Sequence, residues 1–425
     1  MGKWYKLDNA AKIFPSVTNT KNTSVFRVSV LLNDEIDVSI LQKAVDTIFD
    51  RFPAMTVRLR RGVFWNYLDN NTEKLYLCEE REYPCSMINP KENRGYLIKI
   101  LYYKHRISVE VFHSITDGAG AIEFLKSLLY YYLKFLGHSI DSEDIILLAE
   151  DGASASELSD SFRNFYQKKS VVHKIEYMKA YSIKGNYFDN FGNNVIHGVL
   201  SASKLNAAAK AKGVTITAYL TALIIYSIWQ TRMKYGTYDN PVIVAVPVNL
   251  RKYFPSRTLR NFFGVVNVGL RINKDIVFDE LAKDIGESLK EKTGEQYLRN
   301  LIKNNLKFED NNFTRFVPLF IKNIFVNRGF DVWGERKRTL TLSNMGNIIL
   351  PKKMYEFINH FEFVLYPSKK SPINCAVCSS DDILNITFTR AVVETDIIQY
   401  FFSFLAEKEE LDVKIYSNDW GKGDD

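Results

Sequence analysis

The sequence predicts a layered α/β protein built from two halves, each with a sheet and covering helices. The chain has 425 residues, which is long for one hydrophobic core, because domains usually hold about 100 to 200 residues. Strand-like and helix-like runs alternate along both halves. Residues 136–194 show neither pattern and separate the halves. We therefore expect two subdomains, 1–175 and 176–425.

In the first half, β-branched runs alternate with runs of helical periodicity. The predicted order is strand 24–32, helix 40–52, strand 55–60, strands 96–103 and 107–112, and a helix that ends at Gly137. The turn Lys104-His105-Arg106 joins the last two strands, so they are expected to form a hairpin. Pro53 ends the first helix because proline cannot continue the backbone hydrogen bonding.

The connection between the halves is predicted to run over the surface. It contains an acidic stretch of small residues, 141–161, followed by a basic stretch, 167–174. The second half then begins near Val195. Its predicted elements are helices 203–212 and 217–235, strands 241–248 and 263–272, a long helical region 278–307, strands within 338–349 and 374–390, and helix 396–408.

The charge balance argues against a dedicated nucleic-acid-binding protein. The net charge of +7 comes from 56 basic and 49 acidic residues spread along the chain. A local basic patch for a phosphorylated cofactor such as coenzyme A remains compatible with it. The strongest such cluster is Arg251, Lys252, Arg257 and Arg260. The alternative is ordinary solvated surface charge.

The four cysteines favour a structural role. Cys375 and Cys378 form a CxxC pair, but no second pair or histidine cluster supports a metal site. Their segment is strand-like, so the two side chains are expected on opposite faces. No metal is predicted, and the cysteine usage fits a reducing cytoplasm.

No targeting or membrane-spanning segment is predicted. The N-terminal residues lack an apolar signal-peptide core. The longest apolar stretch, 218–229, is about a dozen residues, whereas a spanning helix needs about 20. A cytoplasmic location is therefore expected.

The most informative motif is His113-Ser114-Ile115-Thr116-Asp117-Gly118, between a predicted strand and a predicted helix. A neutral imidazole can take a proton from a hydroxyl, thiol or amine as that nucleophile attacks an acyl carbon. Asp117 can orient the ring or brace the loop. Gly118 permits backbone angles that a side chain would resist. The alternatives are a histidine with a structural role and a partial metal site.

This HxxxDG motif, in its strand–helix context, resembles that of the chloramphenicol acetyltransferase-like superfamily, which includes alcohol acetyltransferases, BAHD acyltransferases, polyketide-associated acyltransferases and condensation domains. Segments 6–15, 247–255 and 342–346 are similar to the alcohol acetyltransferase-type branch. Many relatives carry a second histidine where this chain has Phe112. The DFGWG signature of the BAHD enzymes is absent, and Ser343-Asn344-Met345-Gly346 occupies the comparable region.

The resemblance implies two acetyltransferase-like subdomains that form a pseudo-dimer with a tunnel between them. It implies direct acyl transfer, with His113 as general base and no covalent enzyme intermediate. Asp117 is then expected to pair with Arg251 and hold the loop. Ser343 or Asn344 is a candidate donor to the oxyanion. Acyl-CoA is expected as co-substrate, with no permanently bound cofactor.

Three functions remain open at this point. The first is an acyl-CoA-dependent O-acyltransferase that acts on a small or medium alcohol, or on an amine. The second is a condensation-type or polyketide-associated enzyme that takes its acyl group from a carrier protein. The third is a catalytically silent scaffold of the same fold, which the intact His113 disfavours. A monomer is expected, since the two halves supply one shared interface internally.

Overall fold

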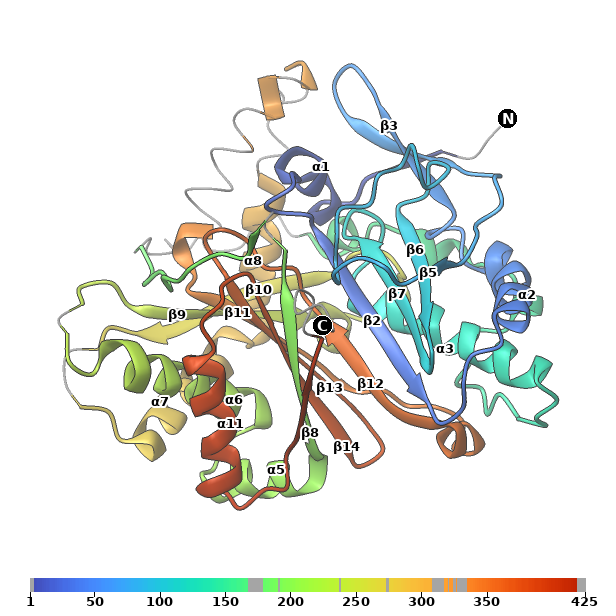
Figure 1. Cartoon of the computed structure of the whole chain (residues 1–425). Helices are drawn as coiled ribbons and strands as arrows, with labels where there is room; N and C mark the ends of the chain where they lie inside the picture. The colour runs from blue at the N-terminus through green and yellow to red at the C-terminus, as the bar shows by residue number, and fades with distance from the viewer. Residues whose placement is uncertain are drawn as a thin grey trace.

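The computed structural model describes residues 4–166, 179–189, 192–236, 238–272, 275–307, 317–319, 321–323, 326 and 335–418. The boundary between residues 175 and 176 and the basic stretch 167–174 lie outside the described residues. Two large sheets with their helices stand side by side, and a small sheet caps the first of them (Figure 1). The predicted α/β class is confirmed.

The first large sheet has five strands in the order β12-β2-β7-β6-β5. Its strands are β2 (Val25–Leu32), β5 (Cys78–Glu79), β6 (Ile98–Tyr103), β7 (Arg106–Phe112) and β12 (Ile358–Val364). It is covered by α2 (Val38–Ile48) and α3 (Gly118–Phe135). The predicted hairpin is β6–β7, with Lys104 at positive φ in its turn.

The small sheet joins β1 (Trp4–Lys6), β4 (Asn66–Asn70) and β3 (Val57–Arg61) in that order. Beside it lie two short turns of helix, η1 (Ala10–Lys12) and α1 (Phe14–Val17).

The second large sheet has seven strands in the order β10-β9-β11-β13-β14-β8-β15. Its strands are β8 (Asn194–Ser201), β9 (Val242–Asn249), β10 (Phe263–Leu270), β11 (Leu340–Asn347), β13 (Ile373–Ser380), β14 (Ile383–Arg390) and β15 (Lys414–Ser417). Its helices are α5 (Ala202–Ala211), α6 (Ile216–Ile228), α7 (Phe278–Lys292), α8 (Glu295–Lys307) and α11 (Asp396–Glu407).

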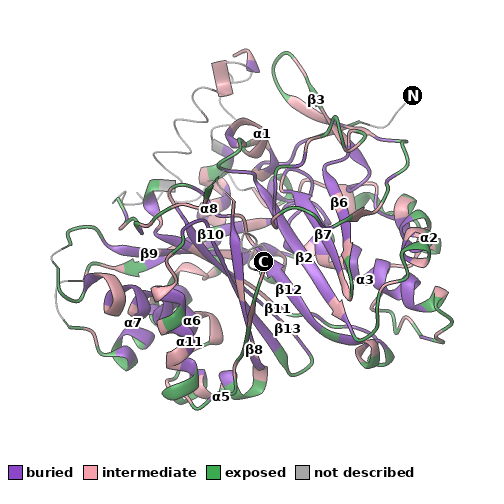
Figure 2. Cartoon of the chain, in the orientation of Figure 1, coloured by how far each residue is buried: buried purple, intermediate pink, exposed green. Residues whose placement is uncertain are grey.

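Three predicted elements of the second half differ in detail. The long helical region divides at Gly294 into α7 and α8. The helix predicted over 217–235 ends in a π-helical turn, η6 (Trp229–Met233). The strands predicted within 374–390 form the hairpin β13–β14. The interior of α6 is buried nearly all round, which explains its continuous apolar sequence (Figure 2).

The connection between the halves contains only short helical turns in its described part. These are η3 (Ala149–Asp151), η4 (Ala155–Leu158) and α4 (Ser161–Asn164). Most of residues 149–157 are exposed, as expected for a surface connection.

One strand crosses from the second half into the first sheet. β12 pairs antiparallel with β2, with Phe361 opposite Val30 and Phe363 opposite Val28. β12 also packs against β13 and β14 of the second sheet. It therefore joins the two sheets, and the sequence patterns did not identify it.

The second sheet separates two hydrophobic cores. Cys375 of β13 faces the core of the second half, and Cys378 faces the core of the first. Both thiols are buried and their pKa values are raised by burial. They are packing residues on opposite faces of one strand, as predicted.

A buried polar cluster lies where the two large sheets meet. Glu362 of β12 accepts a hydrogen bond from Tyr416 at 2.7 Å and lies 3.7 Å from His197 Nε2. His360 Nε2 lies 2.6 Å from the Tyr416 hydroxyl, and Arg106 Nη1 lies 3.9 Å from Glu362. We call these five residues the interface cluster.

Of the helices that the structure describes, none is by itself both long and apolar enough to cross a bilayer. By length and composition alone, 202–211 and 216–233 pass this test when they are taken together across a bend of 77°.

Candidate functional site

His113 lies at the junction of β7 and α3. Its backbone N–H donates to the Ser24 carbonyl at 2.9 Å, which continues the pairing of β7 with β2 for one residue. The chain then turns, and Asp117 becomes the N-cap of α3, where its side chain accepts from the Gly120 N–H at 3.2 Å. Because aspartate is a favourable N-cap, the motif fixes the start of the helix a few residues after the histidine.

Asn261 holds the imidazole of His113. The Asn261 Oδ1 atom lies 3.0 Å from His113 Nδ1. The Asn261 amide nitrogen donates to the His113 carbonyl at 3.0 Å and to Asp8 Oδ2 at 3.3 Å. Asn261 is fully buried, so these contacts have no competition from solvent.

This arrangement assigns the tautomer of His113. Both acceptors around the Asn261 nitrogen are oxygens, which fixes the amide orientation and leaves Oδ1 facing the ring. Because Oδ1 can only accept, Nδ1 carries the proton. Nε2 is then the unprotonated nitrogen, and it has no hydrogen-bond partner among the residues that the structure describes. The ring is set to accept a proton at Nε2.

Three aromatic rings surround the imidazole. Phe14 stacks on it, with centroids 4.5 Å apart and planes at 9°. Phe26 lies at 4.9 Å and Phe263 at 5.2 Å. The resulting desolvation lowers the pKa of His113 below 6.5, against the opposing effect of the Asp117 charge. The neutral, proton-accepting form is therefore favoured at neutral pH.

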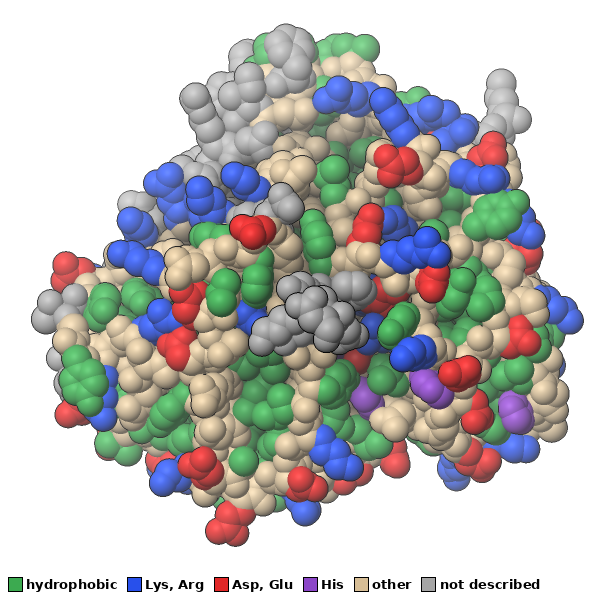
Figure 3. Space-filling view, in the orientation of Figure 1, with side chains coloured by type: hydrophobic (Ala, Val, Ile, Leu, Met, Phe, Trp, Pro, Cys, Tyr) green, Lys and Arg blue, Asp and Glu red, His purple; other side chains and the backbone are tan. Residues whose placement is uncertain are grey.

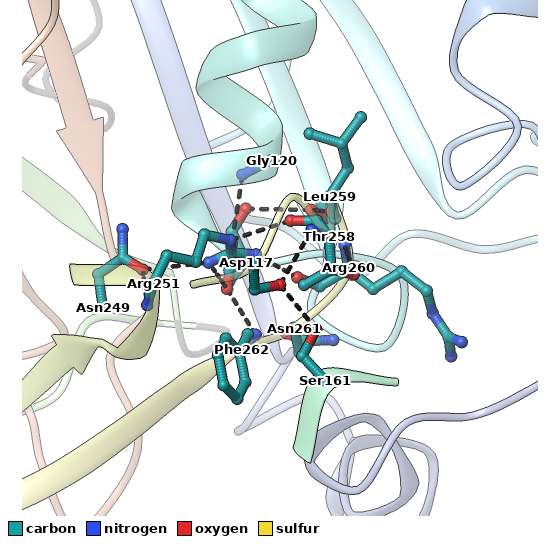
Figure 4. A network of polar contacts seen from close by, with 12 residues as sticks. Asp117, Gly120, Ser161, Asn249, Arg251, Thr258, Leu259, Arg260, Asn261 and Phe262 are labelled. Carbon is teal, nitrogen blue, oxygen red and sulfur yellow. Dashed lines mark hydrogen bonds and ion pairs between the residues drawn. The ribbon is translucent and has the colours of Figure 1, made fainter. Parts of the chain in front are cut away.

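Asp117 and Arg251 are brought together as an ion pair (Figure 4). Arg251 Nη1 lies 2.8 Å from Asp117 Oδ2, and the same oxygen accepts from the Phe262 N–H at 2.8 Å. Arg251 also donates to the carbonyls of Thr258 and Arg260, at 2.9 and 2.5 Å. Asp117 thus ties the start of α3 to the segment 249–262 of the second half, which carries Asn261.

Two glycines of α3 allow close packing at this junction. A Cβ on Gly118 would lie 2.5 Å from Met345 Cε and 2.8 Å from Met345 Sδ. A Cβ on Gly120 would collide with Thr116 Oγ1 and with the Leu259 carbonyl. Met345 belongs to the segment 343–346, so Gly118 brings that segment against the first turn of α3.

The two candidate oxyanion donors have different surroundings. The Asn344 amide donates to Thr217 Oγ1 at 3.0 Å, and its Oδ1 accepts from the Gly346 N–H at 2.8 Å. Its side chain therefore braces its own turn against α6. The Ser343 hydroxyl has a weaker partner, Met345 Sδ at 3.9 Å. Ser343 is the more available donor of the two.

The basic cluster expected to bind the cofactor divides into inward and outward side chains. The Arg251 guanidinium pairs with Asp117 and donates to two backbone carbonyls. Arg260 is buried, donates to the carbonyls of Lys6 and Leu158, and lies 3.5 Å from Asp8. These two guanidiniums hold the site together and are poorly placed to bind a cofactor phosphate. Lys252 and Arg257 are exposed and remain accessible.

Several site residues were not identified from the sequence. Asn261 is the main one, together with Asp8 and the three phenylalanines around the ring. Burial raises the pKa of Asp8 to about 6, against the lowering effect of Arg260. The one available signal for Asn261 is its place just before the predicted strand 263–272. In the described part of the chain no group of three or more His, Cys, Asp or Glu residues is arranged to hold a metal ion.

No protein-family profile matches this sequence, and no curated protein matches it. Solved structures do match over nearly the whole chain. Polyketide synthase associated protein 5 from Mycobacterium tuberculosis is 16% identical with a TM-score of 0.58, over 95% of this chain and 97% of that chain. TRI101 of Fusarium sporotrichioides, complexed with coenzyme A and T-2, is 10% identical with a TM-score of 0.62, over 97% and 99%. A variant of the starter condensation domain of rhizomide synthetase, in complex with C8-CoA and Leu-SNAC, is 11% identical with a TM-score of 0.59, over 96% and 94%.

These matches establish the fold. The chain has the two-subdomain α/β fold of the chloramphenicol acetyltransferase-like proteins, as the sequence motif implied. At 10 to 16% identity the likeness concerns the fold, and the chemistry has to be argued from the residues of this chain.

Proposed function

We propose that this protein is an acyltransferase that moves an acyl group from an acyl-CoA thioester to a small or medium alcohol, with His113 as general base. The observation that supports this most is the contact between Asn261 and His113, which leaves Nε2 as the proton acceptor. The fold supports it as well, because structures of this fold were solved with coenzyme A or C8-CoA bound.

The reaction needs one base and no covalent enzyme intermediate. His113 Nε2 takes the hydroxyl proton as the acceptor oxygen attacks the thioester carbonyl, so a carbon–oxygen bond forms. The tetrahedral intermediate then collapses, the carbon–sulfur bond breaks, and the imidazolium returns the proton to the departing coenzyme A sulfur. The low pKa of His113 keeps the resting imidazole neutral, as the first step requires.

The other residues act around this transfer. Ser343 is the proposed donor to the oxyanion of the intermediate. Asp117 and Arg251 hold the loop and do not touch the reacting atoms. Lys252 and Arg257 are the proposed contacts for coenzyme A phosphates, because they are the exposed cations of the basic cluster.

The experiment is acceptor-dependent release of free thiol from acetyl-CoA and longer acyl-CoA substrates, with a panel of alcohols and amines. His113→Ala is expected to lower kcat about 10²- to 10⁴-fold, the usual contribution of a general base. His138→Ala is the matched control, because His138 packs against Phe357, with ring centroids 4.1 Å apart, outside the site. Equal rates for the wild type and His113→Ala would contradict the proposal.

A carrier-protein donor is the second candidate. It is supported by the likeness to a condensation domain and to a polyketide synthase associated protein. The same assay with acyl groups supplied on a carrier protein distinguishes the two. Turnover with the carrier-bound thioester and none with acyl-CoA would replace the first proposal by the second.

A further inference from the structure

The hairpin β3–β4 ends in three consecutive apolar side chains that face outward. The turn runs from Gly62 to Trp65, and the Gly62 N–H donates to the Trp65 carbonyl at 3.1 Å. Val63 is 73% exposed, Phe64 42% and Trp65 36%. The tip extends beyond the small sheet at the top of Figure 1 and is marked as exposed in Figure 2. We call Val63, Phe64 and Trp65 the apolar tip.

Cations lie directly behind the apolar tip. Lys322 Nζ lies 3.5 Å from the centroid of the Trp65 ring and donates to the Phe64 carbonyl at 3.0 Å. Lys12 Nζ lies 5.4 Å from the same ring. Partial burial and the neighbouring charge of Lys12 both lower the pKa of Lys322, so the two ammonium groups share one region.

The end of β3 next to the apolar tip adds further positive charge. Arg60 and Arg61 of β3 are exposed. Asp69 offsets part of this charge, because it pairs with Arg58 at 3.0 Å and with Arg60 at 3.4 Å. Lys and Arg side chains line the upper edge of the molecule in Figure 3, where the hairpin lies in Figure 1.

One short segment contacts both the apolar tip and the candidate site. Lys12, which lies near the Trp65 ring, is two residues before Phe14, which stacks on His113. Ile13, between them, is 39% exposed. Residues 12–14 therefore link the tip to the surroundings of the imidazole.

We infer that the apolar tip docks the protein on an anionic lipid surface. Aromatic side chains favour the headgroup level of a bilayer, and the surrounding Lys and Arg side chains are attracted to acidic headgroups. A partner protein fits this feature less well. A stable protein interface buries about 800 Å² on each side, whereas the tip is a narrow projection of three side chains. Taken together with the proposed function, docking would bring the protein to a surface where hydrophobic alcohols and acyl chains accumulate.

The test is co-sedimentation of the full chain with lipid vesicles. We expect binding to phosphatidylcholine vesicles that contain phosphatidylglycerol and weaker binding to pure phosphatidylcholine. Added salt should reduce the difference between the two. The double variant Val63→Ser, Phe64→Ser is expected to lower the partition coefficient at least about tenfold, because it removes two apolar side chains from the contact. Arg61→Gln is expected to lower binding to the anionic vesicles alone.

Tyr235→Ser is the matched control, because Tyr235 is an aromatic side chain that is 94% exposed and lies two residues after the end of η6. It is expected to bind like the wild type. Absence of vesicle binding at low salt, equal binding of the wild type and the double variant, or equal binding to both lipid compositions would overturn the inference. Capture of an acidic acyl carrier protein that the double variant abolishes, without vesicle binding, would assign the tip to a protein partner instead.

Discussion

Replacing Asn261 by alanine tests whether this residue sets the proton-accepting nitrogen of His113. The change removes the acceptor of the Nδ1 proton, so the ring can turn and exchange tautomers. One neutral hydrogen bond contributes about 0.5 to 1.5 kcal/mol, which corresponds to about 2- to 13-fold in rate. Because orientation is lost as well, we expect kcat/KM to fall about 10- to 100-fold. This is less than the loss expected for His113→Ala.

The same substitution has a separate cost in stability. It leaves the His113 carbonyl without the donor it has now, whereas Asp8 Oδ2 keeps Arg260 at 3.5 Å. A buried acceptor left unsatisfied costs about 1 to 3 kcal/mol, so the free energy of unfolding should fall by about this amount. Asn385→Ala is a matched control, because Asn385 is a buried asparagine beside the Nδ1 atom of His197, at 3.4 Å. It should lose stability and keep its activity.

Two measurements decide the outcome. Thiol release gives kcat/KM for the wild type and both asparagine variants. Nitrogen NMR of histidine-labelled protein, with His113→Ala to assign the signal, reports the tautomer. We expect Nδ1 to be protonated in the wild type and the two tautomers to be mixed in Asn261→Ala. An unchanged tautomer together with unchanged kcat/KM would refute the assignment of Asn261.

Three further outcomes are expected. Gly120→Ala should destabilise the protein more than Gly118→Ala in denaturant unfolding, because the new Cβ at residue 120 would meet a backbone carbonyl, whereas that at residue 118 would meet the flexible end of Met345. Equal losses of unfolding free energy in the two variants would contradict the packing described. In a plot of kcat/KM against pH, the midpoint of the acidic limb should lie below 6.5, because burial lowers the pKa of His113 and the protonated ring cannot accept a proton. A midpoint above 6.5 would count against His113 as the base. The free energy of unfolding should fall as the pH drops below about 6.5, because burial lowers the pKa of both histidines in the interface cluster and the unfolded chain then binds more protons than the folded one. Asp8, with its pKa raised to about 6, acts in the opposite direction at lower pH, so a profile flat from pH 7 to 6 would show that the cluster does not have this effect.

The carboxylate of the interface cluster acts in the same direction at lower pH. Burial alone would raise its pKa, but His197 and Arg106 outweigh burial and hold the pKa of Glu362 below 4.5. Its contribution to stability is present above that pH and is lost as the pH falls through the lowered pKa.

The sequence predicted the elements that depend on local pattern. The β6–β7 hairpin and α3 follow from alternation and helical spacing, whereas the N-cap role of Asp117 was not predicted. β12 was missed because the sequence INHFEFV of Ile358–Val364 shows no regular alternation of apolar and polar residues. Its partner β2 also lies more than three hundred residues earlier, and local pattern does not indicate such pairing. Asn261 was missed for a related reason, since its role depends on contacts with Asp8 and His113.

The charged residues show a second limit of prediction from sequence. The sequence places Arg251 and Arg260 in one basic cluster, and only the resemblance to the acetyltransferase-like family indicated that Arg251 would pair with Asp117. Nothing in the sequence indicated the direction of Arg260. In the structure both side chains point inward, because they donate hydrogen bonds to backbone carbonyls and form ion pairs with the carboxylates of Asp117 and Asp8. Lys252 and Arg257, from the same stretch, are exposed.

The exchange of β12 between the halves means that neither half is an independent folding unit. A fragment that stops before β12 would leave the long apolar edge of β2 unpaired, and such edges promote aggregation. The second half alone would have to expose β12 with its buried glutamate and histidine. The two halves are therefore expected to unfold in one cooperative transition, and to regain structure from separate fragments only when both are present together.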